Sequence, residues 1–488
     1  MAQVRVSSTL PLNQEVFYKL VHSDIQEGQL IMSESKDTLC EIPLRSKPSN
    51  LKISFTYHKD NSNVQELSAN PTNSLSVGRL QDGRNDPTDI NAIESFHCAI
   101  GPVLSMARIF GLFPVTGIRS VSPSKLRFKI FSFITFYSSF IAAMVFFTMI
   151  VSVSHMLKTL NANTFRTRGG IAAATVGAVF YGNSLMGSIL FFRLSLRWVS
   201  LQCEWRAMER YIDSNSIEPT RLRWKFFFLS TVILVLSFIE HALSMFNSVE
   251  GYDWNASNST FCNFLEVYTL RSHSFLFDTL DYNFIIGLYV FVVSKLATFT
   301  WNFTDLFIML VATGLAERYK SLNKTLAVTV TKYRPTFYWQ ELREDYAILS
   351  CIVKKVDEHI SSIILLSFAN NLYFICLQLL NGLSIPDENI MSAVYFFGSF
   401  GFLIFRTCAV TLLTARIHDQ SKEALPYLYN CSTSSYGIEA QRLQYQLATD
   451  DVALTGLRFF SITRNFMLAV AGAIITYEVV LLQFNGVK

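Results

Sequence analysis

Charged side chains are scarce in this sequence. Asp, Glu, Lys and Arg make up 16% of its 488 residues, against roughly 25% in soluble domains. Half of the residues are hydrophobic, and 42 are Phe. Apolar runs that could cross a hydrocarbon layer of ~30 Å, which takes about 20 helical residues, recur along the chain. The shortage of charge therefore excludes an ordinary soluble domain and indicates an integral membrane protein.

Sequence motifs of catalytic, metal-binding and phosphate-binding sites are also missing. No metal-ligand spacing, glycine-rich phosphate loop or nucleophile elbow occurs, and the eight Cys residues form no disulfide framework. Glu240 and His241 come nearest to an acid–base pair, but adjacent residues of a helix point to different sides. We expect no enzyme, no metal and no cofactor. The net charge of +4 also leaves no basic patch for nucleic acid.

The apolar runs predict an all-α membrane protein with seven transmembrane helices. The runs exceed the 9–11 residues of a membrane barrel strand and lack period-two alternation. The expected spans are Phe128–Val153, Gly169–Phe192, Phe226–Phe246, Asp278–Val311, Ile360–Asn381, Met391–Thr414 and Gly456–Phe484. The fourth is long enough to continue past the bilayer.

The distribution of Lys and Arg predicts the orientation, because cytoplasmic connections carry the excess of basic residues. Arg193–Lys225 has seven and Arg318–Lys355 has eight, whereas Asn247–Arg271 has one. We therefore expect a cytoplasmic N-terminus and an extracellular C-terminus. Two glycosylation sequons, at Asn255 and Asn258, fall in the connection that this orientation makes extracellular.

We divide the chain into four parts. The polar residues 1–90 predict a disordered cytoplasmic tail, and residues 91–127 a cytoplasmic or interfacial helix, since Arg108 and two prolines argue against an eighth span. Residues 128–455 are expected to form a six-helix bundle with cytoplasmic helical extensions. Residues 456–488 form the seventh helix, with its first third outside the membrane.

Glu317-Arg318-Tyr319 resembles the acidic-Arg-Tyr triplet of rhodopsin-like G-protein-coupled receptors. It follows the fourth span here rather than the third, and no Asn-Pro-x-x-Tyr occurs near the C-terminus. We interpret it as a solvated helix end.

Polar groups at membrane depth carry the strongest functional signal, because a charge against lipid costs about 2.5–3.5 kcal/mol on insertion scales. They gather in the outer halves of the spans. The candidate ligand-binding residues are Tyr181, Asn183, Glu240, His241, Ser244, Asp278, Asp281, Tyr282, Asn370, Tyr373, Gln378 and Tyr395. Asp278, Asp281 and Tyr282 have the spacing of one helix face.

These groups admit two interpretations. Carboxylates, amides and aromatic rings around an outer cavity suit a sugar, whose hydroxyls need many hydrogen bonds and whose apolar face can lie on a ring. The same groups could instead bond helices together at ~0.6 kcal/mol each. On the inner side Asn302, Thr304, Asp305 and Arg406 are expected to be structural, with Asp305 and Arg406 paired across helices four and six.

The seventh span ends in an unusual stripe. Thr476, Val480 and Gln483 lie along one side of the helix, and Leu481 and Phe484 lie on the next. Several copies of this helix on a symmetry axis would line a narrow passage, and apolar rings can gate ion flow by dewetting. Composition alone does not establish such an assembly.

Thr476-Tyr477, five residues, then Gln483-Phe484 resembles the C-terminal signature of insect gustatory receptors. The Glu after the Tyr, together with the segment 94–115, is similar to the sugar-receptor branch. The resemblance covers about residues 94–488. It implies tetramers of seven-helix subunits, either homotetramers or heterotetramers with sibling receptors, that form ligand-gated cation channels, with cytoplasmic anchor helices and a ligand-binding bundle in each subunit.

The same resemblance implies roles for the last helix. Gln483 and Phe484 would form the extracellular gate, with Thr476, Val480 and Leu481 nearby on the pore wall. The expected protein is a sugar-gated non-selective cation channel in the plasma membrane of gustatory neurons. Its partners would be a small sugar, permeant cations and the lipid bilayer.

Two other classes remain open from the residues alone. A sugar transporter would also have polar outer cavities, although repeated halves with interrupted helices are not evident in the sequence. A G-protein-coupled receptor would carry its N-terminus outside. The sequence does not specify which sugar binds.

Overall fold

The protein is described by a computed structural model that covers residues 94–161, 170–213, 221–250, 261–277, 281–330, 332, 334–382, 390–433 and 436–485. The described chain is mainly helical. Its longer helices are α3 (Phe96–Ile109), α4 (Phe133–Thr159), α5 (Gly170–Asp213), α6 (Leu222–Ser248), α7 (Phe261–Ser272), α9 (Phe284–Thr329), α10 (Thr336–Gly382), α11 (Ile390–Lys422), α13 (Ile438–Thr449) and α14 (Arg464–Asn485). Shorter elements are α8 (Ser274–Phe277), α12 (Leu425–Tyr429), η1 (Pro123–Lys125) and the strands β1 (Val115–Thr116), β2 (Arg127–Phe128), β3 (Thr455–Gly456) and β4 (Phe460–Ser461).

Six of the described helices are long and apolar enough to cross a membrane: α4, α5, α6, α9, α10 and α11. They correspond to the first six predicted spans. The seventh, α14, has 22 residues, but only its beginning, Arg464–Thr476, has described side chains in continuous order, and this part is apolar and short. The all-helical membrane fold is confirmed, with six to seven apolar helices.

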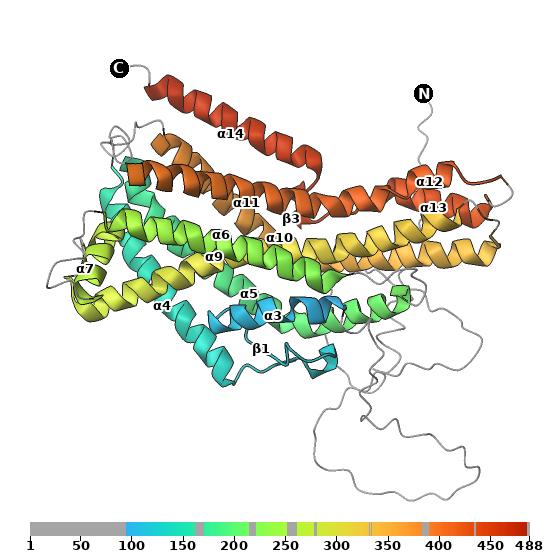
Figure 1. Ribbon diagram of the computed structural model, residues 1–488, viewed down its shortest axis with the longest axis horizontal. Coiled ribbons are helices and arrows are strands. Elements are labelled where there is room, and N and C mark those ends of the chain that lie inside the picture. Colours follow the sequence, from blue (N-terminus) through green and yellow to red (C-terminus); the bar gives the residue numbers. More distant parts are fainter. Residues whose placement is uncertain are drawn as a thin grey trace, which may run out of the picture. The chain divides into compact units, whose positions relative to one another are not determined.

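Three spans continue far beyond the bilayer. Helices α5, α9 and α10 have 44, 46 and 47 residues, whereas about 20 residues suffice to cross a hydrocarbon core. The long helices run beside one another, with α7 at one end and α12 and α13 at the other (Figure 1). We name these the α7 end and the α13 end. The expected helical extensions are thus the same helices as the spans, continued without a break, together with α12 and α13.

The extensions bury charged residues at the α13 end. Arg318 is 3% exposed and donates hydrogen bonds from α9 to Glu209 (2.9 Å) and Asp213 of α5. The Tyr319 hydroxyl lies 2.9 Å from that of Ser350 on α10. The interpretation of Glu317-Arg318-Tyr319 as a solvated helix end is therefore wrong, because α9 runs 46 residues through the middle of the bundle and its continuation is enclosed by its neighbours.

Helix α3 packs against α5, α6 and α9, and its 14 residues are fewer than the about 20 that cross a hydrocarbon core. Ser95 caps its N-terminus, accepting a hydrogen bond from the backbone N–H of Cys98, and the Phe96 N–H donates to Glu209 Oε1 at 2.9 Å. The Phe96 ring stacks on Trp205 of α5 with centroids 3.9 Å apart. These contacts hold α3 to the same helix that binds Arg318.

The start of the predicted seventh helix at Gly456 is wrong. Strands β3 and β4 form an antiparallel hairpin there, and α14 begins only at Arg464. Leu457 and Arg458 turn the chain with φ of 48° and 61°, a left-handed conformation that a helix cannot contain. The first span likewise begins later than expected, at Phe133 after the Ser132 N-cap.

Candidate ligand-binding site

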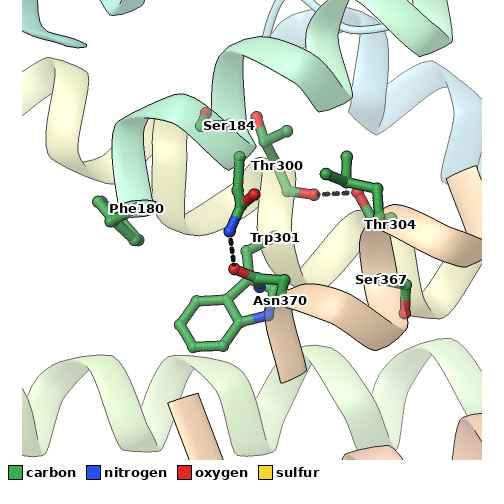
Figure 2. Close-up of a pocket in the computed structure, with 9 residues that line it drawn as sticks. Phe180, Ser184, Thr300, Trp301, Thr304, Ser367 and Asn370 are labelled. Carbon is green, nitrogen blue, oxygen red and sulfur yellow. Dashed lines mark hydrogen bonds between the residues drawn. The ribbon is translucent and has the colours of Figure 1, made fainter. Parts of the chain in front are cut away.

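A small cavity lies between α5, α9 and α10 (Figure 2). Its lining residues are Phe180, Asn183, Ser184, Thr300, Trp301, Thr304, Leu366, Ser367 and Asn370. Asn183 donates a hydrogen bond from its amide to Asn370 across the cavity, so two predicted ligand-binding residues meet. The centre of a water molecule can occupy about 20 Å³ there, which is room for about one water and not for a sugar.

A buried ion pair lies beneath this cavity. Arg406 Nε of α11 is 2.8 Å from Asp305 Oδ2 of α9, and the two side chains are 3% and 0% exposed. Asp305 also accepts hydrogen bonds from Ser367 and from Asn371 at 2.5 and 3.1 Å. The predicted pairing across the fourth and sixth spans is confirmed. Its extra hydrogen bonds are what make a buried pair tolerable in a medium of low dielectric constant.

Trp301 connects the cavity to the ion pair. Its indole N–H donates to Asn371 Oδ1 at 3.1 Å, and the Arg406 guanidinium lies 4.4 Å from its ring centroid. The ring also stacks on Phe374 of α10, with centroids 4.5 Å apart. A displacement of α10 or α11 would therefore change contacts at the cavity wall as well as in the ion pair.

A second polar cluster joins α6, α10 and α11. Ser399 donates a hydrogen bond to Glu240 Oε1 at 3.0 Å and accepts one from Gln378 Nε2 at 3.1 Å. The Tyr395 hydroxyl is within hydrogen-bonding reach of Ser399 and Ser244. Ser399, which sequence reasoning missed, thus brings together three of the predicted residues, Glu240, Gln378 and Tyr395, and Ser244 joins them through Tyr395. We call this group the Glu240 cluster.

Lys295 is the other residue that sequence reasoning missed. It lies within α9 and donates a hydrogen bond to the Tyr268 hydroxyl of α7 at 2.8 Å. Its ammonium is also 4.6 Å from the Tyr268 ring centroid and 4.5 Å from that of Phe291. The sequence could have indicated this residue, because a lysine in the outer part of the fourth span carries the same cost of placing a charge against lipid that selected the carboxylates.

His273 follows α7 and faces the same region. Its Nδ1 lies 2.6 Å from the Ser272 hydroxyl, and burial, with the charge of Lys295 second, lowers the pKa of His273 to about 3. Burial likewise raises the pKa of Tyr268 above its usual value. Both groups are therefore neutral at physiological pH.

Two buried polar atoms near these groups have no hydrogen-bond partner among the described residues. They are His241 Nε2, on the residue that follows Glu240, and Gln378 Oε1, whose Nε2 belongs to the Glu240 cluster. An unsatisfied buried polar atom costs about 1–3 kcal/mol. Hydroxyl groups of a bound molecule could remove that cost.

Other predicted residues lie elsewhere. Tyr181 is fully buried and packs with Val145 of α4 and Val293 of α9. The Tyr373 hydroxyl pairs with Thr175 at 2.7 Å. Asp281 and Tyr282 precede α9, which is capped by Asn283. The expectation that they share a helix face is therefore wrong, and Asp278 lies outside the described residues.

The predicted pore and glycosylation residues are less fully described. Thr476 is exposed on α14, and its hydroxyl donates to the Gly472 carbonyl at 2.8 Å. The side chains of Val480, Leu481, Gln483 and Phe484 lie outside the described residues. So do the sequons at Asn255 and Asn258.

Known proteins match the chain over most of its length. Residues 60–488 match the family model described as trehalose receptor. The Drosophila melanogaster gustatory receptor for sugar taste 64f is 33% identical over 82% of this chain and 83% of its own length. The gustatory receptor 5a for trehalose, from the same fly, is 34% identical over 81% of this chain and 86% of its own length.

Solved structures agree on the fold. The insect olfactory receptor OR5 from Machilis hrabei superposes with a TM-score of 0.57, covering 79% of this chain and 97% of that chain at 15% sequence identity. The same receptor in complex with eugenol superposes with a TM-score of 0.53 and 14% identity.

Proposed function

The chain belongs to the trehalose receptor family, and on that premise we propose that it is a sugar-gated, non-selective cation channel that acts as a gustatory receptor. The observation that supports a sugar ligand is the Glu240 cluster, together with His241 Nε2 and Gln378 Oε1, which are unpaired in the described part of the chain. A carboxylate, an amide, hydroxyls and an aromatic ring supply the hydrogen bonds and the flat surface that sugars need. Its relatives are sugar-taste and trehalose receptors.

In this proposal the site opens as it binds. The cavity beside Asn183, between α5, α9 and α10, has room for about one water, so a sugar bound there would favour a shape in which α10 stands farther from α5 and α9. Ligand shifts the closed–open balance only by its difference in affinity for the two states. The difference would come from contacts that Gln378 and His241 make only when sugar is present.

The pore is assigned to four copies of α14. Gln483 and Phe484 would ring the extracellular gate, with Leu481, Val480 and Thr476 on the wall. Candidate sugar contacts are Asn183, Glu240, His241, Ser244, Asn370, Gln378 and Tyr395, while Tyr181, Tyr373, Asp278, Asp281 and Tyr282 remain proposed at the periphery. The plasma membrane of gustatory neurons is the proposed location, with Asn255 and Asn258 glycosylated outside the cell and the N-terminus inside.

Whole-cell recording tests the proposal. Cells that express the chain, alone or with a sibling subunit, should pass inward current on sugar addition when G-protein signalling is blocked. A current that disappears with that block would favour the G-protein-coupled alternative, and saturable uptake of labelled sugar without current would favour a transporter. The fold similarity to an olfactory receptor favours neither alternative.

A further inference from the structure

An apolar groove lies between α4, α8 and α9, whereas the Glu240 cluster joins α6, α10 and α11. It has a volume of about 530 Å³. The lining residues are Phe140, Ala143, Met144, Phe147, Thr148, Val151, Leu276, Ile285, Ile286, Tyr289 and Val290. Phe140, Phe147 and Ile285 are 56%, 52% and 72% exposed, so the groove opens outward from two membrane-crossing helices.

The polar groups in the groove are already bonded to each other. Tyr289 donates its hydroxyl proton to the Met144 carbonyl at 2.6 Å, and the Thr148 hydroxyl lies 3.1 Å from that of Tyr289. A polar ligand would find little to bind here. Water is also a poor occupant of an apolar space without two to four polar partners.

The dimensions suit one leaflet of a bilayer. Phe140 and Val151 are eleven residues apart on α4, and at about 1.5 Å per residue the groove runs roughly 16 Å along that helix. Half of a hydrocarbon core of ~30 Å is about 15 Å. Leu276 of α8 lines the groove at the α7 end. This end lies beside the predicted extracellular connection, where we expect a lipid head group to lie.

We propose that this groove binds an acyl chain of a membrane phospholipid from the leaflet on the α7 side. If the groove were empty, its wall atoms would lack dispersion contacts on one side. An acyl chain lying in the groove supplies those contacts, which makes the groove a defined site. The inner wall of the groove also contacts residues near the proposed ligand-binding site. Met144 of α4 and Tyr289 of α9 pack on the core of Val145, Tyr181 and Val293, and Tyr289 lies less than two turns from Lys295 on α9.

Photolabelling tests the site without requiring channel activity. The full chain is reconstituted in nanodiscs with a phosphatidylcholine that carries a diazirine on one acyl chain, and labelled peptides are mapped by mass spectrometry. We expect labelling at Met144–Val151 and Ile285–Val290 several-fold above that at Phe238, a 75% exposed residue of α6 outside the groove.

Filling the groove should remove that excess. Ala143→Trp is expected to lower groove labelling several-fold, whereas Val235→Trp, at a 50% exposed position on α6, should leave it unchanged. Ile286→Trp fills the groove from α9 if the first variant does not fold. Labelling no higher than at Phe238, displacement by a sterol but not by phospholipid, or cross-links to a second copy of the chain would each overturn the proposal.

Discussion

At the scale of the residue, single charged side chains within the spans constrain most strongly how the helices pack. Within the spans Asp305 is paired with Arg406, and Glu240 lies near enough to Arg406 to interact with it electrostatically. Lys295 is a further basic side chain within the spans, and it donates a hydrogen bond to Tyr268. Since an unpaired charge in this setting is costly, the positions of these four side chains constrain how α6, α9 and α11 can pack.

Glu240→Gln tests the proposed sugar contact. A hydrogen bond to a charged group contributes about 1.5–3 kcal/mol, so the sugar concentration for half-maximal current should rise by roughly tenfold or more. Dose–response recording measures the shift. Glu266→Gln, an exposed position on α7, is the matched control and should respond like the wild type. An unchanged half-maximal concentration for Glu240→Gln would remove this residue from the site.

Arg406→Met tests the ion pair with Asp305. Removing one partner of a buried pair costs about 3–5 kcal/mol, because the other charge stays buried without compensation. The purified variant should therefore unfold at a clearly lower temperature. Adding Asp305→Asn should recover part of the loss, and thermal unfolding in detergent measures both. Additive losses in the double variant would contradict the pairing.

At the scale of the element, the β3–β4 hairpin connects the bundle to α14. Asp357 of α10 accepts hydrogen bonds from the Thr455 backbone N–H at 2.6 Å and from its hydroxyl at 2.7 Å. The Phe460 ring of β4 stacks on Phe466 of α14 with centroids 4.5 Å apart, and Phe368 of α10 contacts both rings. Helix α10 therefore contacts both the candidate site and the start of the proposed pore helix.

Asp357→Ala tests that connection. Losing both acceptors leaves the half-buried Thr455 donors without their partners, at a cost of up to about 1–3 kcal/mol, so the hairpin should follow α10 less closely. We expect a smaller open fraction at saturating sugar with an unchanged single-channel conductance, measured in excised patches. Glu358→Ala, exposed on the next position of the same helix, serves as the control. A changed conductance would place the effect in the pore itself.

At the scale of the whole molecule, the long helices build two regions from one set of elements. Near the α7 end they enclose polar groups suited to a ligand. Near the α13 end they bury the ion pair of Arg318 with Glu209, and the half-buried pair of Arg343 with Glu439 joins α10 to α13. Continuous helices of 44–47 residues connect the two regions, which suits the proposed separation of the ligand site from the pore.

Tags at the two ends test orientation and assembly together. On intact cells a C-terminal tag should be accessible to antibody and an N-terminal tag should not, because the excess of basic residues in alternate connections predicts a cytoplasmic N-terminus. Single-molecule bleaching of a fluorescent fusion should show the step distribution of a tetramer. An accessible N-terminal tag, or a monomeric bleaching pattern, would contradict the channel architecture.

The apolar runs and the charge balance were enough to predict the membrane class, the first six spans and the Asp305–Arg406 pair. Each depends on a large local free-energy cost: unsatisfied backbone or unpaired charge in hydrocarbon. Hydropathy of a segment and the sign of a side chain report that cost directly, whatever the neighbouring elements do. The short C-terminal signature also indicated the family, through the positions of its residues in the last span.

Only the tertiary structure decided which polar groups meet. Ser399 and Lys295 acquire their roles from α10 and α7, and the Glu317-Arg318-Tyr319 segment is buried because neighbouring helices continue beside it. The hairpin at Gly456 replaces a helix start because its contacts with α10 outweigh local propensity. Hydropathy is a property of single residues. Which side chains bond to one another depends instead on how each helix is rotated and which helices it contacts. Both are fixed only when the whole bundle packs.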